Sequence, residues 1–130
     1  MKQIKEHQRK VANIFQESAY TPYQDDKGND LGTSYIQLNS DKPRDVGFYI
    51  YRMSPGSHST PHQHGGCEEF VVVQGDLMDN DGTEYGPGDV VWLAPGTEHT
   101  STTTNGCIVA VYSEGLEFKP GTDGKPLPIS

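Results

Sequence analysis

The stretch that decides the fold is Gly56 to Gly75, GSHSTPHQHGGCEEFVVVQG. His62 and His64 stand two residues apart in it. Side chains at i and i+2 of a strand project from the same face, so both imidazoles can reach one point. Glu68 has the same parity, although the Gly-Gly pair before it can add a turn or bulge. The stretch therefore predicts a cluster of metal-ligand side chains on β-structure.

A second cluster lies further along the chain, at Gly88 to His99, GDVVWLAPGTEH. His99 follows a Pro-Gly turn, and strands this far apart in sequence become neighbours in a barrel. Three imidazoles and a carboxylate suit zinc, iron(II), manganese, nickel or copper, and do not suit calcium or magnesium. A histidine-rich surface loop is the alternative for the first cluster taken alone. We expect one divalent transition metal, zinc or iron(II) before nickel or manganese, bound by His62, His64, Glu68 and His99.

The chain from Leu31 onward has the composition of short strands. Candidate strands, rich in Val, Ile, Thr, Tyr and Phe, cover residues 31–38, 47–53, 68–74, 83–85, 90–93, 100–104 and 107–112. Gly and Pro turn signals separate them, and Asn105-Gly106 is the strongest hairpin signal in the chain. Short strands at regular spacing predict an all-β sandwich or barrel.

The two ends of the chain differ from this pattern. Ile4, Val11 and Phe15 recur on one helical face, which predicts a short N-terminal helix over residues 2–17. The tail, residues 118–130, holds three prolines and two glycines and is expected to be an ordered wrap or a loose end. We expect a single domain over residues 1–130, with its core at about residues 31–115.

Charge and composition exclude several classes of partner. The net charge of −8 argues against nucleic acid and against an anionic membrane surface. No segment reaches the ~18 consecutive apolar residues that span a bilayer. The basic, polar N-terminus is no secretory signal, so a cytoplasmic location is the default expectation. Cys67 and Cys107 are accordingly expected to be free thiols.

The spacing of both clusters resembles the two sequence motifs of the cupin superfamily. The first motif is matched at every fixed position, by Gly56, His62, His64, Glu68 and Gly75. The second is matched by Gly88, Gly96 and His99. It departs at two positions that supply no ligand, because Ala94 stands where a turn proline is usual and Thr103 where an asparagine is usual. The resemblance covers about residues 45–112 and implies a double-stranded β-helix, the jelly-roll barrel.

Within the superfamily, residues 64–70 and the Ala94-Pro95-Gly96 turn look most like the ChrR-type cupins. That group includes the zinc-binding half of certain anti-sigma factors, and it is similar to small dioxygenases that cleave acetylacetone or dihydroxyacetophenone. A separate helical domain binds the sigma factor in those anti-sigma proteins. This chain has one short helix at most, so we do not expect that role.

The resemblance leaves two function hypotheses open. In the first, the protein is a dioxygenase-type oxidoreductase acting on a small organic ketone or acid, with Glu68 tuning the metal or accepting a proton. In the second, it is a non-catalytic zinc module for ligand sensing or metal-stabilised structure. Some related dioxygenases bind metal through histidines alone, which would leave Glu68 beside the metal.

Three expectations about side chains and one about assembly accompany these hypotheses. Glu69 is the alternative ligand to Glu68 but should alternate to the outer face. His58 is expected at the surface rather than as a proton shuttle. Aromatic and aliphatic residues are expected to line a cavity for a small-molecule ligand, with ordinary core packing as the alternative: Phe70, Val72, Trp92 and Tyr112. We also expect a homodimer, because cupins commonly pair and both chain ends could serve as arms.

Overall fold

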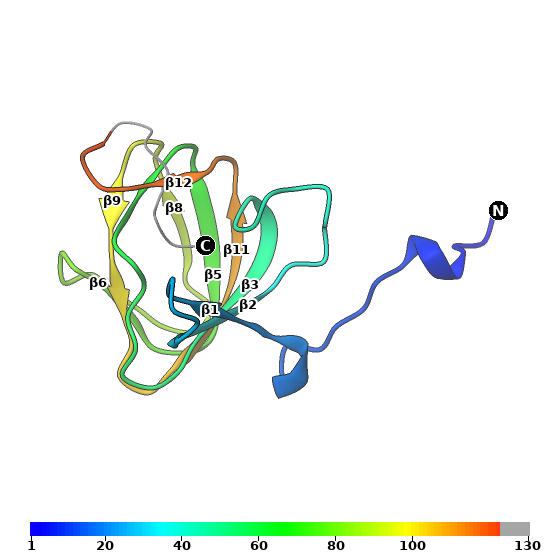
Figure 1. Ribbon diagram of the computed structural model, residues 1–130, viewed down its shortest axis with the longest axis horizontal. Coiled ribbons are helices and arrows are strands. Elements are labelled where there is room, and N and C mark those ends of the chain that lie inside the picture. The colour runs from blue at the N-terminus through cyan, green and yellow to red at the C-terminus, as the bar shows by residue number, and fades with distance from the viewer. Residues whose placement is uncertain (123–130) are drawn as a thin grey trace.

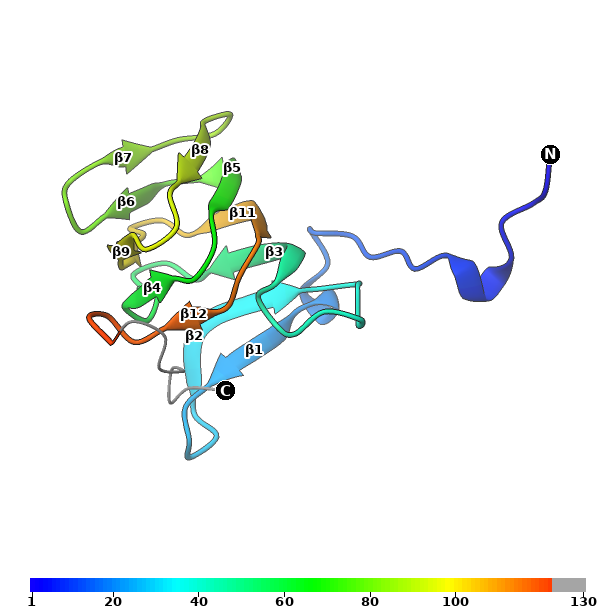
Figure 2. The same ribbon diagram turned by 90° about the horizontal axis from the view of Figure 1, so that it is seen from above.

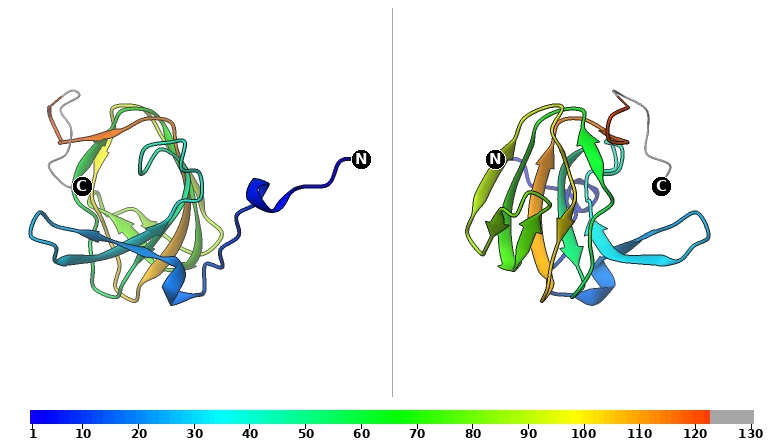
Figure 3. Two further views of the ribbon diagram at one scale, coloured as in Figure 1. Left: turned by 45° about the vertical axis from the view of Figure 1, so that its right-hand side comes forward. Right: turned by 90° about the vertical axis from the view of Figure 1, so that its left-hand side faces the viewer.

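Within the part of the chain that the structure describes, twelve short strands form three antiparallel sheets that curve into a barrel (Figure 1). The structure is a computed structural model and describes residues 1–122. The largest sheet contains, in spatial order, β1 (Thr21–Gln24), β2 (Asp30–Ile36), β3 (Gly47–Met53), β11 (Cys107–Ser113), β5 (Glu68–Gly75) and β8 (Val90–Leu93). Seen along the barrel in the left panel of Figure 3, the sheets enclose a common interior.

Two three-stranded sheets complete the wall opposite the large sheet. One contains β10 (Ser101–Thr102), β6 (Leu77–Asp79) and β7 (Glu84–Tyr85). The other contains β12 (Glu117–Phe118), β4 (His62–His64) and β9 (Glu98–His99). Figure 2 shows β4 and β9 beside each other, next to β12. This small sheet therefore brings together chain segments that are far apart in sequence.

The hydrophobic core is formed by the inward-facing residues of three neighbouring strands. Val111 of β11 lies between Tyr49 of β3 and Phe70 of β5 in the ladder, and all three are buried. Val109 lies opposite Val72 in the same way. Because side chains alternate along a strand, a row of residues paired across the sheet shares one face. The interior is thus filled from β3, β5 and β11, which supports the barrel around the histidines.

Two of the four aromatic and aliphatic wall residues expected from the sequence lie on the other side of the sheet. Phe70 and Val72 are buried in the core, as expected. Trp92 and Tyr112 are instead exposed, at 60% and 44%. The reason is strand parity, because both pair across the ladder with Glu69, the outward neighbour of the inward-facing Glu68. The expectation that Trp92 and Tyr112 line the cavity was wrong.

The N-terminal helix expected over residues 2–17 does not form. The segment contains only two single-turn 3-10 helices, η1 (Glu6–Gln8) and η2 (Glu17–Ala19), joined by extended chain. Short helices are marginal in water unless tertiary packing covers an apolar face. Ile4, Val11 and Phe15 are 61–83% exposed, so nothing stabilises that face here. The three apolar residues of the predicted helical face are too few to hold a helix against the barrel.

The expected strands occur with small shifts at their ends, and further strands were not expected. The sequence pattern missed β1, β6 and β12, which are only two to four residues long. The tail begins as β12, and residues 123–130 lie outside the described part of the chain.

Cys67 and Cys107 are both free thiols. Among the described residues, no helix has the length and apolarity to cross a membrane.

Candidate metal centre

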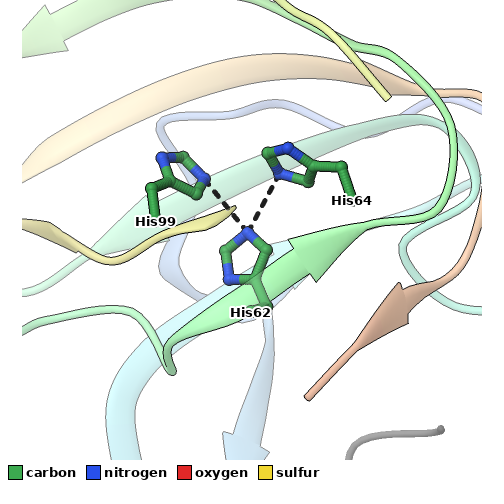
Figure 4. A group of neighbouring side chains, drawn as sticks. All are labelled: His62, His64 and His99. Atoms are coloured by element: carbon green, nitrogen blue, oxygen red, sulfur yellow. Dashed lines mark hydrogen bonds between the residues drawn. The ribbon is translucent and has the colours of Figure 1, made fainter. Parts of the chain in front are cut away.

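The three histidines converge because two short strands pair in register. His62 of β4 lies directly opposite His99 of β9, and His64 follows two residues later on the same face of β4. The Nε2 atom of His62 is 3.1 Å from Nε2 of His64 and 3.1 Å from Nε2 of His99. Figure 4 shows the three rings pointing at one another from the two strands. All three residues are largely buried.

The other ring nitrogen of each histidine has a hydrogen-bond acceptor beside it. The Nδ1 atoms of His62 and His99 are 2.7 Å from the carbonyl oxygen of Thr60 and 3.0 Å from a carboxylate oxygen of Asp79, respectively. Nδ1 of His64 is 3.0 Å from Oγ1 of Thr97. That hydroxyl already donates to a carbonyl, so it accepts from the imidazole. Each Nδ1 therefore carries the proton, and each Nε2 presents a lone pair.

Three lone pairs that face one another in a buried site repel unless a cation lies between them. Two nitrogens 3.1 Å apart subtend about 95–100° at an ion ~2.0–2.1 Å from each, which is an ordinary bond angle for a transition metal. Acceptors on the remote nitrogen are the usual way in which proteins orient metal-binding histidines. The residues present thus fit a divalent transition metal, and His62, His64 and His99 form a candidate metal-binding cluster.

Glu68 lies beside this cluster at the start of β5. Its carboxylate is 3.1 Å from Nε2 of His64, and its side chain is only 8% exposed. Burial raises the pKa of Glu68, but the three imidazoles beside it, His64 foremost, outweigh the effect of burial, so the pKa is lowered on balance. Glu68 is therefore held as a carboxylate at a distance from which it can complete a metal site.

A second carboxylate, Glu117 of β12, also lies beside the cluster. Its Oε1 atom is 3.7 Å from Nε2 of His62, and burial raises the pKa of this carboxyl group despite the nearby imidazoles. His62, Glu68 and Glu117 form a second candidate group of ligands. The motif spacing could not reveal Glu117, because it lies outside both histidine clusters.

The glycines between β4 and β5 explain how Glu117 comes to lie there. The N–H of Gly65 donates to the carbonyl of Leu116, 2.8 Å away, beside the β12 strand. A Cβ atom added to Gly65 would lie 2.5 Å from the Phe118 ring, and one on Gly66 would lie 2.8 Å from the backbone nitrogen of Gly115. Only glycine permits this close approach of two backbones. The Gly-Gly pair was the one sequence signal that could have pointed to this contact.

Asp79 of β6 holds the His99 ring in place. One of its carboxylate oxygens accepts from His99 Nδ1 and from the Ser101 hydroxyl, 2.6 Å away, while the other accepts from the Tyr85 hydroxyl, 2.7 Å away. Burial raises the pKa of Asp79, but these hydrogen bonds more than offset it and leave the pKa lowered. The carboxylate is thus a fixed, ionised acceptor that sets the tautomer of His99.

A cavity of about 100 Å³ opens beside the histidines inside the barrel. His62, Glu68, His99 and Glu117 all contribute to its wall. Its apolar wall comes from Phe70, Leu77, Val109 and Val111. Any ion bound by the histidines would therefore face a partly open, largely apolar space of the size of a small organic molecule.

A polar group closes one side of this cavity, and sequence reasoning missed it. Asp45 accepts a hydrogen bond from the Tyr23 hydroxyl, and Arg44 lies 3.5 Å from its carboxylate and over the Tyr23 ring. Asp45 adopts a φ of 69°, and its N–H donates to the Gln37 side chain, 2.9 Å away. Asp tolerates this left-handed conformation better than most residues. The loop is therefore held in a defined position beside the site.

The other residues singled out from the sequence lie away from the cluster. Glu69 is exposed on the outer face of β5, so Glu68 is the glutamate that faces the histidines. His58 is not part of the cavity wall, and its ring contacts the carbonyl of Ser59, 3.2 Å away. His7 is exposed on the N-terminal segment. The site has the geometry that metal binding requires. Metal binding itself stays a prediction for the four residues His62, His64, Glu68 and His99.

The barrel and its candidate metal site define a cupin. A family model for the ChrR cupin-like domain matches residues 11–117. The chain belongs to this ChrR cupin-like family, in agreement with the resemblance of its two motifs. No curated protein matches the chain.

Solved structures share the fold at low sequence identity. The acetylacetone dioxygenase of Acinetobacter johnsonii aligns with a TM-score of 0.70 and 17% identity, over 97% of this chain and 88% of that one. A candidate acetylacetone dioxygenase of Methylibium petroleiphilum aligns with a TM-score of 0.66 and 13% identity, over 93% and 90%. These likenesses confirm the all-β cupin fold.

The anti-sigma protein ChrR is a more partial match. In the complex of Rhodobacter sphaeroides SigE with ChrR, the aligned chain gives a TM-score of 0.56 and 22% identity. The alignment covers 65% of this chain and 45% of that one. This chain thus spans less than half the length of that relative.

Proposed function

We propose that the protein is a metal-dependent oxidoreductase of the dioxygenase type that acts on a small organic ketone or acid. The observation that carries the proposal is that the histidine cluster forms part of a cavity wall. A site that only stabilised the fold would have no need of a largely apolar cavity beside its ligands. Zinc or iron(II) fits the ligand set, and nickel or manganese is also compatible with it.

The chain's own groups have distinct parts in this proposal. A bound metal would act as a Lewis acid toward oxygen atoms of the substrate. Glu68, 3.1 Å from His64, either completes the metal site or accepts a proton from a substrate lying in the cavity. Phe70 and Val109 shield that space from water, because both are buried inward-facing residues of the barrel. The proposal therefore names Glu68 as the catalytic residue.

The size of the cavity restricts the substrate class. About 100 Å³ of space holds a small organic molecule and excludes a macromolecule, so no nucleic acid or membrane lipid is proposed as a substrate. The likeness of fold to an acetylacetone dioxygenase makes small diketones the first compounds to test.

A non-catalytic zinc module is the second candidate function. The observation in its favour is that His62, His64, Glu68 and His99 can together supply four ligands, which is the number in a closed tetrahedral zinc site. In that case the ion would mainly contribute folding energy.

Metal analysis of protein purified without added metal, followed by oxygen-uptake assays with small diketones and hydroxyketones, tests the proposal. We expect His99→Ala to abolish metal binding and turnover while the barrel remains folded by circular dichroism. His58→Ala is the matched control, because this histidine lies outside the cavity, and it should retain both.

The two functions give different outcomes in the same experiment. Oxygen uptake that depends on the metal and on His99 supports the enzyme. Stoichiometric zinc with no uptake on any ketone or acid, together with unfolding on chelation, would favour the zinc module instead.

A further inference from the structure

The tyrosine hydroxyls inside the barrel differ in how they are bonded. Tyr23 donates to the carboxylate of Asp45, and Tyr85 donates to that of Asp79, 2.7 Å away. Tyr49 of β3 is only 4% exposed, yet residues 1–122 offer its hydroxyl no hydrogen-bond partner, and the charges near it act only through space. A buried hydroxyl without a partner is unfavourable, so nearly all of them have one. The exception at Tyr49 therefore calls for an explanation.

The Tyr49 hydroxyl borders on the cavity inside the barrel. The Tyr49 side chain forms part of the wall of that cavity, beside the histidines. Within the described residues, the Oε1 atom of Gln63 is the only side-chain atom that lacks a hydrogen-bond partner and is also completely covered. The Tyr49 oxygen has no partner but is not completely covered, so it keeps contact with open space. At a position this deeply buried, that space is the cavity.

The charged groups that act most strongly on this hydroxyl belong to the candidate metal centre. They are the carboxylates of Glu68 and Glu117, in that order. His62 and His99 line the same cavity as Tyr49. A molecule that fits a space of about 100 Å³ can therefore contact both the Tyr49 hydroxyl and an ion held by the histidines.

The Tyr49 hydroxyl acts as a hydrogen-bond donor and not as a phenolate. Burial raises the pKa of Tyr49 well above its usual 10, and the negative charges of Glu68 and Glu117 raise the pKa further. The hydroxyl therefore keeps its proton at neutral pH. A carbonyl or carboxylate oxygen of a ligand is the acceptor that matches such a donor.

Apolar neighbours increase the effect of this donor. Val111 pairs with Tyr49 across the ladder, Phe70 is the next residue in the same row, and all three line the cavity. A hydrogen bond is stronger in such a low-dielectric setting than in water. Ligand pockets combine an apolar lining with a few polar groups that fix the orientation of the ligand. Tyr49 has the position and the chemistry of such a group.

We propose that Tyr49 is a substrate-binding residue, whose hydroxyl donates a hydrogen bond to a carbonyl or carboxylate oxygen of the molecule in the cavity. The inference rests on the proposed function, because that molecule is the substrate of the proposed enzyme. Tyr49 has a part separate from that of Glu68, since it orients the molecule and takes no proton from it. A compound of the same size without an oxygen atom at this place leaves the hydroxyl unpaired, so Tyr49 selects against it.

Tyr49→Phe tests the proposal, because it removes the hydroxyl and keeps the ring. Calorimetric titration of acetylacetone and of acetoacetate into the metal-free and the zinc-loaded protein measures binding without turnover. The variant should bind about two- to twelvefold more weakly, which is the effect of one neutral hydrogen bond. A loss for acetylacetone identifies a carbonyl oxygen as the acceptor, and a loss for acetoacetate alone identifies the carboxylate. Zinc affinity and the urea midpoint should not change, because no described residue uses the hydroxyl.

Tyr35→Phe is the matched control. Tyr35 of β2 is partly buried but lies outside the cavity wall, so loss of its hydroxyl should leave both affinities unchanged. Equal affinity of Tyr49→Phe and the wild type for both compounds would overturn the proposal, and so would a wild type that binds neither at millimolar concentration. A fall in zinc affinity or in the urea midpoint of Tyr49→Phe would also overturn it, because either would show that the hydroxyl is bonded within the protein.

The inference and the proposed function can fail separately in these experiments. Binding that depends on Tyr49, without oxygen uptake on any compound, would refute the dioxygenase and retain the binding role of Tyr49. Oxygen uptake by Tyr49→Phe at the wild-type rate and KM would support the enzyme and overturn the role of Tyr49.

Discussion

Replacing Asp79 by asparagine tests whether the histidine geometry serves a metal. The carboxylate accepts from three donors, which are His99, Ser101 and Tyr85. In asparagine, one oxygen and one NH₂ group take the place of the two carboxylate oxygens. If the oxygen stays toward His99 and Ser101, the negative charge is lost and the Tyr85 hydroxyl must accept from the NH₂ group instead of donating. If the NH₂ group faces His99, the imidazole must move its proton to Nε2 and lose the lone pair that would bind the ion.

The expected loss follows from these two arrangements. Removal of the partner that orients a metal-binding histidine costs ~10–100-fold in affinity, which corresponds to about 1.4–2.7 kcal/mol. We expect the lower figure if the amide oxygen keeps its place and the higher figure if it does not. The assay is competition between the protein and a coloured chelator for the metal found in the purified protein.

Asp81→Asn is the control for this variant. Asp81 lies two residues away in the exposed turn after β6, where its carboxylate accepts from the N–H of Thr83, 3.0 Å away. Asparagine can make the same hydrogen bond, so the metal affinity should not change. An Asp79→Asn protein that binds metal as tightly as the wild type would refute the role of Asp79 in orienting His99.

Three further predictions concern the barrel and the ion pair between Arg52 of β3 and Glu17 of the N-terminal segment. Burial raises the pKa of Glu117 above its ordinary 4.5, so the metal-free fold prefers the protonated form. That contribution to stability is complete below pH 4.5 and lost as the pH rises through the raised pKa. Glu117→Gln should therefore stabilise the metal-free protein against urea at neutral pH, and equal stability of the two proteins there would contradict this. Phe70→Ala, at a side chain 5% exposed, should cost about 3–5 kcal/mol in urea unfolding. Glu17→Gln should hardly change the melting temperature in calorimetry, because the carboxylate is 86% exposed. Arg52→Ala should lower it more, because it also removes the stacking on Tyr20.

The part of the site that could be predicted is the part encoded in local spacing. His62 and His64 share a face wherever they lie on a strand, and the turn before His99 places it at a strand start. Asp79 and Glu117 could not be found in this way, because each reaches the histidines through pairing of strands that are distant in sequence. Their carboxylates look like ordinary surface residues until the register of the small sheets is known.

Periodicity failed in the N-terminal segment and on the outer face for a related reason. A pattern shows which residues share a face, but it does not show whether anything packs against that face. Ile4, Val11 and Phe15 have helical spacing, yet no part of the barrel covers them and no helix forms. The side of the sheet that Trp92 would occupy depends on its pairing with Glu69, which is a property of the fold.

The last prediction concerns the linkage between metal binding and stability. Glu68 and Asp79 are buried carboxylates with lowered pKa values, and three lone pairs face one another beside them. Burial of this negative site without a cation is unfavourable, so metal binding should stabilise the fold. At a free metal concentration of 100 times the dissociation constant, the gain is ~2.7 kcal/mol.

The barrel has a core of its own at β3, β5 and β11, which does not include the histidines. We therefore expect the metal-free protein to remain folded and to melt at a lower temperature, and His99→Ala to melt at the metal-free temperature whether metal is present or not. Thermal melts with and without chelator measure both. Complete unfolding on chelation would show that the ion holds the barrel together, and an unchanged melting temperature would show that the three histidines bind no metal at all.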